Sequence, residues 1–252
     1  MCRIIKKGFA AVLCAVVLIG AAGCASWFGK DQEKTAPELA EEGEQYFGDE
    51  KYSKAIEAYE RLRNWYPYSR YTKTAELRIA DAHYNLKEYE QARTAYEYYE
   101  RMHPGDSEIP YVIFRIGMCH YERIRSIDRT QVPTRDALEA FSRLQSRFPE
   151  SDYAEKAEPR IKECRRRLAG HEFYVGRFYF KSGQYEAALN RFENLVSTYP
   201  DVEKYREDAA EYIALTEKRL EEMDGEKEDD VIRQPTGSGG QGQDPVPVMP
   251  GQ

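Results

Sequence analysis

The sequence of 252 residues holds little of the chemistry that enzyme active sites use. Its four histidines show no metal-ligand spacing, and neither a glycine-rich phosphate loop nor a nucleophile elbow occurs. Cys119 and His120 are neighbours, so on a helix their side chains point roughly 100° apart and form no catalytic dyad. We therefore expect a protein that is not an enzyme, with no catalytic residue, no metal site and no cofactor bound within the fold.

A surplus of positive charge is also missing. The formal net charge is −7, with 37 Lys and Arg against 44 Asp and Glu. Because nucleic-acid binding needs a clustered basic surface, a nucleic-acid partner is not expected. The one basic run, residues 162–167, is interpreted as the solvated face of a helix, with a contact for an acidic partner surface as the alternative.

Only one long hydrophobic run is present, and it stands at the start of the chain. Residues 9–22 are almost entirely apolar and follow three basic residues, which is typical of an export signal. The run is too short for a comfortable membrane span. Ala22-Gly23 before Cys24 resembles the bacterial lipobox, although Ala21 replaces the usual leucine.

The start of the chain therefore predicts a lipoprotein signal peptide over residues 1–23. Cys24 would carry a diacylglycerol and an N-acyl chain, and residues 24–36 would be a lipidated tether. Several acyl chains on one cysteine hold a protein firmly to a membrane. A plain secretory signal cleaved near Ala25 is the alternative. In Gram-negative bacteria the lipobox resemblance implies sorting to the outer membrane, on its periplasmic face.

Two of the five cysteines, Cys119 and Cys164, would remain free of these processing steps. The predicted compartment is oxidising, so a disulfide between them is allowed. Both residues fall on helical stripes, and the sequence does not fix their separation. Two buried free thiols are the favoured interpretation, and a disulfide stays open.

A fixed spacing of alanine, aromatic residue and proline occurs four times in the chain. The aromatic residue follows the alanine by four positions and the proline follows it by twelve; the sets are Ala55/Tyr59/Pro67, Ala92/Tyr96/Pro104, Ala137/Phe141/Pro149 and Ala188/Phe192/Pro200. Steps of three and four residues lie on one helix face, and proline ends a helix. The pattern is that of the tetratricopeptide repeat, a helix–turn–helix unit of about 34 residues.

The repeats predict an all-α fold, a tetratricopeptide-repeat-like α-solenoid of four to five helix pairs over residues 37–222. An ordinary antiparallel helix bundle with chance spacing is the alternative. Small residues at matched points of the first helices would let each pair pack tightly; these are Gly43, Ala80, Gly117 and Gly176.

The repeats are not evenly spaced, which predicts insertions in the array. Residues 125–133 would form a polar loop within the third repeat, and residues 152–182 one long helix that tolerates Pro159. Residues 202–222 predict a last helix that caps the array. Residues 223–252 carry no helical pattern and are expected to be a disordered tail.

The first helices of such repeats line a concave surface, where exposed aromatic side chains would suit an extended peptide. The predicted peptide-binding groove consists of Phe47, Leu77, Asp81, Tyr84, Phe114 and Tyr121. The alternative for each residue is that it packs against a neighbouring repeat.

Local motifs beyond the repeats narrow the choice of family. They are Asp128-Arg129-Thr130, Ser151-Asp152-Tyr153-Ala154, Leu168-Ala169 with Glu172-Phe173, Phe178-Tyr179, and Gly183-x-Tyr185-x-Ala187-Ala188-x-Asn190-Arg191. Together with the lipoprotein signal, these motifs resemble the BamD family of outer-membrane protein assembly factors.

The resemblance implies a scaffold of the β-barrel assembly complex (BAM), attached to the outer membrane by lipid. Such a protein binds BamA and other assembly-complex subunits and receives unfolded outer-membrane β-barrel precursors. By position, the groove around Phe47 and Tyr84 would receive precursor, and Asn190 and Arg191 would face BamA. A pilus-secretin or cell-division adaptor of the same fold is the alternative. The single helix over residues 202–222 departs from the family, which has a complete last pair.

Overall fold

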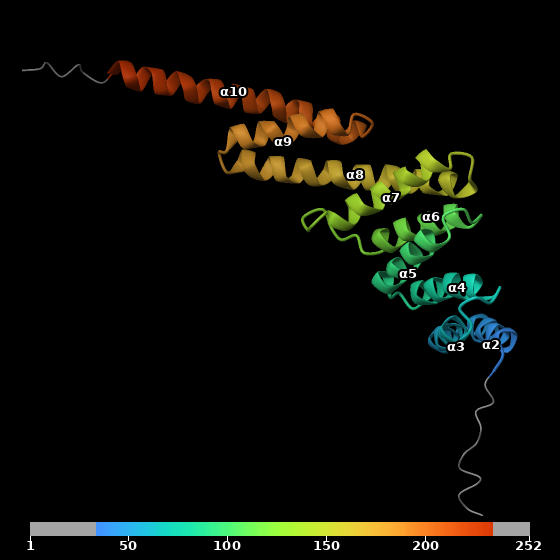
Figure 1. The fold of residues 1–252 in the computed structure, drawn as a ribbon. Helices are drawn as coiled ribbons and strands as arrows, with labels where there is room; N and C mark the ends of the chain where they lie inside the picture. The colour runs from blue at the N-terminus through green and yellow to red at the C-terminus, as the bar shows by residue number, and fades with distance from the viewer. Residues whose placement is uncertain (1–33, 234–252) are drawn as a thin grey trace, which may run out of the picture. The chain divides into compact units, whose positions relative to one another are not determined.

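The computed structural model describes residues 34–233, and this part of the chain is helical with no strand (Figure 1). The helices are α2 (Ala36–Gly48), α3 (Tyr52–Trp65), α4 (Thr72–Asn85), α5 (Tyr89–Met102), α6 (Ile109–Tyr121), α7 (Val132–Arg147), α8 (Asp152–Lys181), α9 (Tyr185–Thr198) and α10 (Glu203–Arg233). The predicted signal peptide, Cys24, the tether up to residue 33 and residues 234–252 lie outside the described residues.

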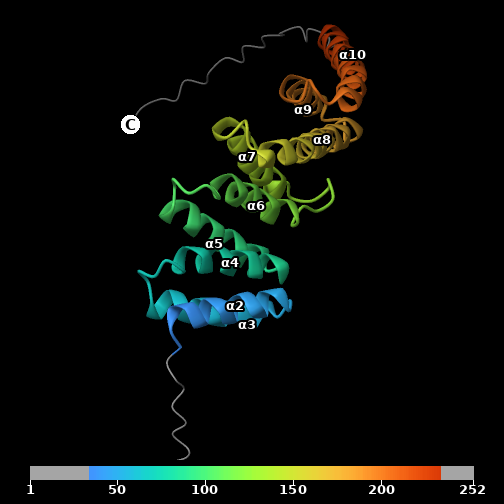
Figure 2. The same ribbon diagram turned by 90° about the vertical axis from the view of Figure 1, so that its right-hand side faces the viewer.

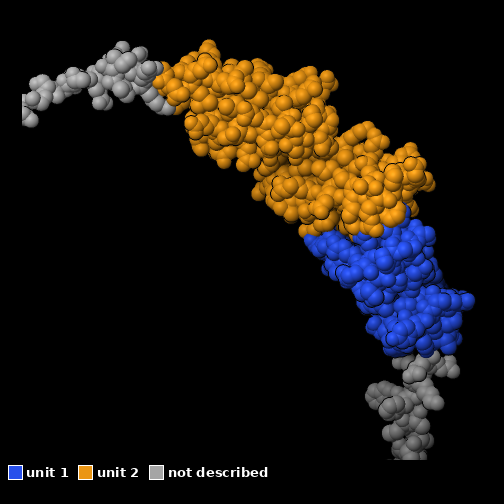
Figure 3. Space-filling model, turned by 45° about the horizontal axis from the view of Figure 1, so that its top comes forward, with its two compact units in different colours: residues 1–112 blue, residues 113–252 orange. Residues whose placement is uncertain are grey.

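Consecutive helices pack in pairs that follow one another along the chain, as Figures 1 and 2 show. The described residues therefore confirm the all-α repeat architecture, with four pairs and one further helix, α10. The chain divides into an N-terminal unit up to Val112 and a C-terminal unit from Ile113 (Figure 3). Each unit is described by itself below.

The repeat anchors occupy the core as their spacing predicts. All four anchor alanines are fully buried, and their aromatic partners Tyr59, Tyr96, Phe141 and Phe192 are at most 1% exposed. Each second helix ends two residues before its proline. Burial of these large rings supplies the main apolar area of each repeat.

The small residues of the first helices lie directly under these rings. A Cβ atom at Gly43, Gly117 or Gly176 would come within 2.4, 2.5 and 2.6 Å of the facing ring, closer than real Cβ atoms approach. In the second repeat Ala80 takes this position and is fully buried. The close approach of helices inferred from the sequence is confirmed.

The turn inside the first, second and fourth repeats contains one residue with positive φ, two positions before the first residue of the second helix. Glu50 (φ 58°), Lys87 (φ 62°) and Gly183 (φ 72°) hold this place. The next residue donates its N–H back to a carbonyl five positions earlier, as in Lys51 N to Tyr46 O at 2.8 Å. Only the fourth repeat uses glycine, the residue that takes this conformation without strain.

The long helix α8 matches the predicted span of residues 152–182. It begins at the N-cap Ser151, whose Oγ accepts a hydrogen bond from the N–H of Tyr153 at 3.2 Å, and it contains Pro159. The third-repeat insertion is a polar loop held by Gln131. The Gln131 amide donates to the carbonyl oxygens of Ser126 (3.1 Å) and Arg129 (2.9 Å).

The structure tests two further expectations, the disordered tail from residue 223 and the state of Cys119 and Cys164. Helix α10 continues to Arg233, so the prediction of a disordered tail from residue 223 was wrong for residues 223–233. The segment holds two glutamates and one lysine, which are good helix formers, and Arg219 pairs with Glu222 at 2.8 Å in the turn just before it. Cys119 and Cys164 are both buried and form no disulfide with each other, as favoured. Burial raises the pKa of the Cys164 thiol to about 12.

Candidate functional site

Two of the predicted groove aromatics pack across the turn of their own repeat. The ring of Phe47 meets Tyr52 edge-on at 5.3 Å, and Tyr84 meets Tyr89 in the same way at 5.3 Å. The Arg78 guanidinium lies 4.9 Å from the centre of the Phe47 ring. Phe47 and Tyr84 are half-buried, so part of each ring still faces solvent.

Asp81 was expected to point outward, and this was wrong. Its side chain is buried, and Oδ1 accepts hydrogen bonds from the hydroxyls of Tyr96 (2.6 Å) and Tyr111 (2.5 Å). A buried carboxylate needs such donors, because burial without partners is costly. Asp81 therefore ties α4 to α5 and to the start of α6.

Leu77 lies half-buried one helical turn before Asp81. Phe114 and Tyr121, in the C-terminal unit, are also half-buried. Phe114 contacts Phe141 and Tyr153, each at 5.8 Å, and Tyr121 lies under Arg160 at 4.9 Å. These aromatic positions pack against neighbouring helices and are half-buried.

A hollow of about 440 Å³ lies in the N-terminal unit between α3, α4 and α5. It is lined by Glu60, Arg63, Glu76, Ile79, His83, Glu90, Gln91, Thr94, Ala95 and Tyr98. None of the predicted groove residues lines it, because it uses the opposite face of α4. Ile79, Ala95 and Tyr98 give it an apolar part, which suits one apolar side chain of a peptide.

The predicted partner-facing pair, Asn190 and Arg191, lines a depression of about 380 Å³ in the C-terminal unit. The depression lies between α8 and α9, and Tyr179, Ala187 and Asn194 complete it. Its polar groups are two amides, a guanidinium and a phenol. The structure thus places both predicted residues in one surface hollow.

Arg191 is held in place and remains accessible. Its guanidinium bonds to Oε2 of Glu172 at 3.1 Å, while 44% of its side chain is exposed and Glu172 is mostly buried. A guanidinium carries five N–H donors in a planar fork. With one edge fixed by Glu172, Arg191 can present further donors to a carboxylate of another chain.

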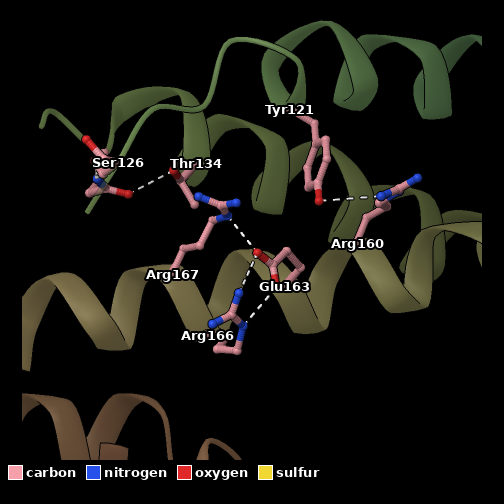
Figure 4. Close-up of polar contacts among 8 residues, drawn as sticks. Tyr121, Ser126, Thr134, Arg160, Glu163, Arg166 and Arg167 are labelled. Atoms are coloured by element: carbon pink, nitrogen blue, oxygen red, sulfur yellow. Dashed lines mark hydrogen bonds and ion pairs between the residues drawn. The ribbon is translucent and has the colours of Figure 1, made fainter. Parts of the chain in front are cut away.

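The basic run of α8 is neutralised within the protein (Figure 4). Arg166 and Arg167 both pair with Glu163, at 2.8 and 2.7 Å, and hydrogen bonds from Arg166 lower the pKa of Glu163. Arg165 donates to Asp201 and to the carbonyl of Thr198 (3.0 Å), and the bond to Asp201 lowers the pKa of that carboxyl. The pairs with Glu163 lie within α8 itself, and only Arg165 of the three arginines joins α8 to Thr198 of α9 and to Asp201, in line with a solvated helix face.

Sequence reasoning missed three polar residues here: two that line the depression and Glu172, which holds Arg191. Asn194 follows Asn190 by one helical turn, so the i,i+4 spacing could have found it. Tyr179 and Glu172 come from the preceding helix, and only the packing of α8 on α9 brings them to Arg191.

Among the described residues, no helix is both long enough and apolar enough to cross a membrane.

Comparison with known proteins identifies the family. A family model named YfiO and described as an outer membrane lipoprotein matches residues 32–230. The chain belongs to this family. The resemblance to the BamD family inferred from the sequence is confirmed, and the match favours this family over a pilus or cell-division adaptor.

Several relatives are described as the outer membrane protein assembly factor BamD. Over 200 residues the chain is 30% identical to the outer membrane protein assembly factor BamD of Neisseria gonorrhoeae, covering 75% of this chain and 74% of the relative. For BamD of Caulobacter vibrioides the identity is 29% over 201 residues, covering 77% and 66%. For BamD of Vibrio cholerae it is 30% over 162 residues, covering 60% and 67%.

Solved tetratricopeptide-repeat structures are more distant. The TPR2AB domain of yeast Sti1, in its pHSP90 complex, is 17% identical with a TM-score of 0.41, covering 73% of this chain and 70% of that one. A thermophilic TPR protein of Thermus thermophilus is 14% identical with a TM-score of 0.39, covering 71% and 100%. At these scores the likeness carries no argument, and the repeat fold rests on the helix pairs themselves.

Proposed function

We propose that this protein is a non-enzymatic scaffold of the β-barrel assembly complex. Its C-terminal unit binds BamA, its N-terminal unit receives unfolded outer-membrane β-barrel precursors, and acylated Cys24 anchors it to the outer membrane on the periplasmic side. The main support is that Asn190 and Arg191 share an accessible depression in a member of this family. Other assembly-complex subunits would join through further surfaces of the array.

The depression suits an acidic loop of BamA. Glu172 fixes the orientation of Arg191, so little side-chain entropy is lost when a second carboxylate binds. The amides of Asn190 and Asn194 can donate to backbone carbonyls of the same loop. Arginine anchors of this kind dominate the binding energy of many interfaces.

Precursor binding would use the half-exposed aromatic edges of the N-terminal unit. Phe47 and Tyr84 occupy the same place in successive repeats, so their exposed edges recur along the stack. An extended chain with aromatic side chains can bind such edges without covalent chemistry. The hollow that contains Tyr98 offers a second apolar contact in the same unit.

The BamA contact is tested with purified protein and the periplasmic domains of BamA. Arg191→Glu should weaken binding at least about tenfold, since truncating or reversing a hot-spot charge costs about 2 kcal/mol or more. Arg219→Glu is the matched control, because Arg219 is an exposed arginine of α10 outside the depression. Equal affinity of wild-type protein and Arg191→Glu would reject the proposed contact.

A further inference from the structure

The connection between α3 and α4 exposes large aromatic side chains in an unusual way. Trp65, the last residue of α3, is 51% exposed, and Tyr68 is fully exposed. Residues 65–71 are called the aromatic loop below. Met102 holds the repeat position of Trp65, two residues before its proline, and is also exposed.

The aromatic loop is rigid rather than frayed. The N–H of Ser69 donates to the carbonyl of Tyr66 at 3.0 Å, and the hydroxyl of Thr72 donates to the same carbonyl at 2.7 Å. These bonds hold the backbone while the rings of Trp65 and Tyr68 face solvent. A fixed, exposed pair of aromatic rings is a surface built for contact.

The loop lies beside the point at which the described chain begins. The hydroxyl of Tyr66 donates to the carbonyl oxygen of Lys34 at 3.0 Å. Lys34 follows Cys24 by ten residues, so even a fully extended chain spans at most about 33–36 Å between them. A lipid on Cys24 would therefore keep Lys34, which the Tyr66 hydroxyl contacts, within that distance of the membrane surface.

The chemistry of the loop suits the boundary between headgroups and acyl chains. Trp and Tyr rings are enriched at this boundary because they combine an apolar body with a polar group. Arg70, whose guanidinium lies 4.7 Å from the centre of the Tyr71 ring, forms no ion pair with the part of the chain that the structure describes. Its charge can therefore contact a lipid phosphate.

We propose that the aromatic loop is a second membrane contact, which inserts Trp65 and Tyr68 into the lipid interface beside the anchor. The proposal rests on the lipid anchor of the proposed function. Two rings bind a membrane weakly on their own, but the anchor supplies a high local concentration of lipid, so weak partitioning is sufficient. The contact fixes the orientation of the first repeat at the membrane.

The test uses full-length, lipidated protein in vesicles of phosphatidylethanolamine and phosphatidylglycerol. The chain has two tryptophans, Trp27 and Trp65, so Trp27→Phe leaves Trp65 as the sole reporter. Its fluorescence should shift to the blue and be quenched when the phospholipids carry brominated acyl chains. Tyr68→Ser, in the same background, should lose most of this quenching, whereas Tyr174→Ser, which removes an exposed tyrosine of α8, should keep it.

The outcomes separate the loop from the anchor. If the protein floats with the vesicles but Trp65 is neither shifted nor quenched, the loop proposal is overturned and the anchor stands. If intact acylated protein does not float with the vesicles, both the anchor and the loop contact that rests on it are rejected. Cys24→Ser, which cannot be acylated, is the negative control and should not float. A blue shift that grows with protein concentration in the absence of vesicles would assign the rings to a contact between two copies and reject the lipid contact.

Discussion

The two units hold their repeats together by different chemistry. In the N-terminal unit, buried or half-buried carboxylates join successive helices: Asp81 accepts from Tyr96 and Tyr111, and Glu76 lies 2.6 Å from Nε2 of His103. In the C-terminal unit, aromatic rings do this work. Phe173 contacts Phe192 at 5.8 Å, Tyr205 at 5.8 Å and Tyr212 at 5.5 Å.

The difference explains which predicted site residues changed role. A buried carboxylate with two donors satisfies neighbouring helices and has little capacity left for a ligand, so Asp81 acts as a structural tie. In the C-terminal unit Arg191 remains 44% exposed beside the ring contacts of Phe173, and it lines the depression with Asn190.

The largest effect is expected from a substitution that disrupts the aromatic packing of the C-terminal unit. Phe192→Ala removes a fully buried ring that meets Phe173, Tyr212 and Gly176, and should cost about 3–5 kcal/mol of unfolding free energy. Hydrogen exchange should show the loss mainly in α8, α9 and α10, because repeat arrays lose stability locally.

Phe178→Ala is the matched control, because Phe178 lies on α8 and is 59% exposed. This variant should change the unfolding free energy by less than about 0.5 kcal/mol. A similar loss for both phenylalanines would contradict the account of the aromatic core.

The second largest effect is expected from removal of the buried Asp81 carboxylate, which joins helices of the N-terminal unit. Asp81→Ala leaves the buried hydroxyl of Tyr96 without its acceptor and should cost about 1–3 kcal/mol. Urea unfolding and exchange in α4 and α5 measure it. Glu57→Ala, at an exposed position of α3, should stay within about 0.5 kcal/mol of wild type. If Asp81 instead binds a ligand, the variant would keep wild-type stability and lose precursor binding.

A smaller effect compares the turns of the repeats. Gly183→Lys places a side chain at φ 72° and should destabilise the C-terminal unit by roughly 1 kcal/mol, whereas Lys87→Gly relieves the same conformation in the N-terminal unit. Thermal unfolding of the two variants gives the comparison. A stabilising Gly183→Lys substitution would show that the turn does not need the left-handed conformation.

The smallest effect concerns acid. Hydrogen bonding to Lys73 lowers the pKa of Asp106, so the ionised form is favoured by folding. This contribution is present above the ordinary aspartate pKa of about 4 and is lost as the pH falls through the lower, folded value. Asp106→Asn should therefore flatten the acid side of the stability profile, modestly because Lys73 is exposed.

Asp201→Asn is the equivalent test in the C-terminal unit, since Arg165 lowers the pKa of Asp201. Unfolding free energy measured from pH 7 downward gives both profiles. If the unfolding free energy of either variant fell more steeply with decreasing pH than that of the wild type, the predicted role of the carboxylate would be contradicted.

The spacing of anchor residues was sufficient to predict the helix pairs and the close contacts at Gly43 and Gly176, and the helical stripe from Tyr153 to Leu168 predicted the long helix α8. The sequence was a poorer guide to which face of a first helix meets solvent. The Phe47 ring contacts Tyr52 and Arg78, and only the fold places Arg78 there. The length of α10 was missed because its last turns lack the apolar stripe used to recognise helices.

The part of the candidate site that lies on a single helix could be predicted from the sequence. Asn190 and Arg191 stand together in the sequence, so their shared depression follows from one helix face. Glu172 and Tyr179 join them only through the packing of α8 on α9. Asp81 carried no sequence signal of burial, because its tyrosine donors are 15 and 30 residues away in the chain.

The most direct test of a two-ended scaffold is photocrosslinking in living cells. A photoreactive amino acid at Asn190 borders the depression without removing Arg191, and one at Tyr84 reports on the aromatic edges of the N-terminal unit. We predict crosslinks to BamA from residue 190 and to nascent β-barrel precursors from residue 84. Repeated absence of BamA from the first site, with precursors absent from the second, would contradict the proposed scaffold.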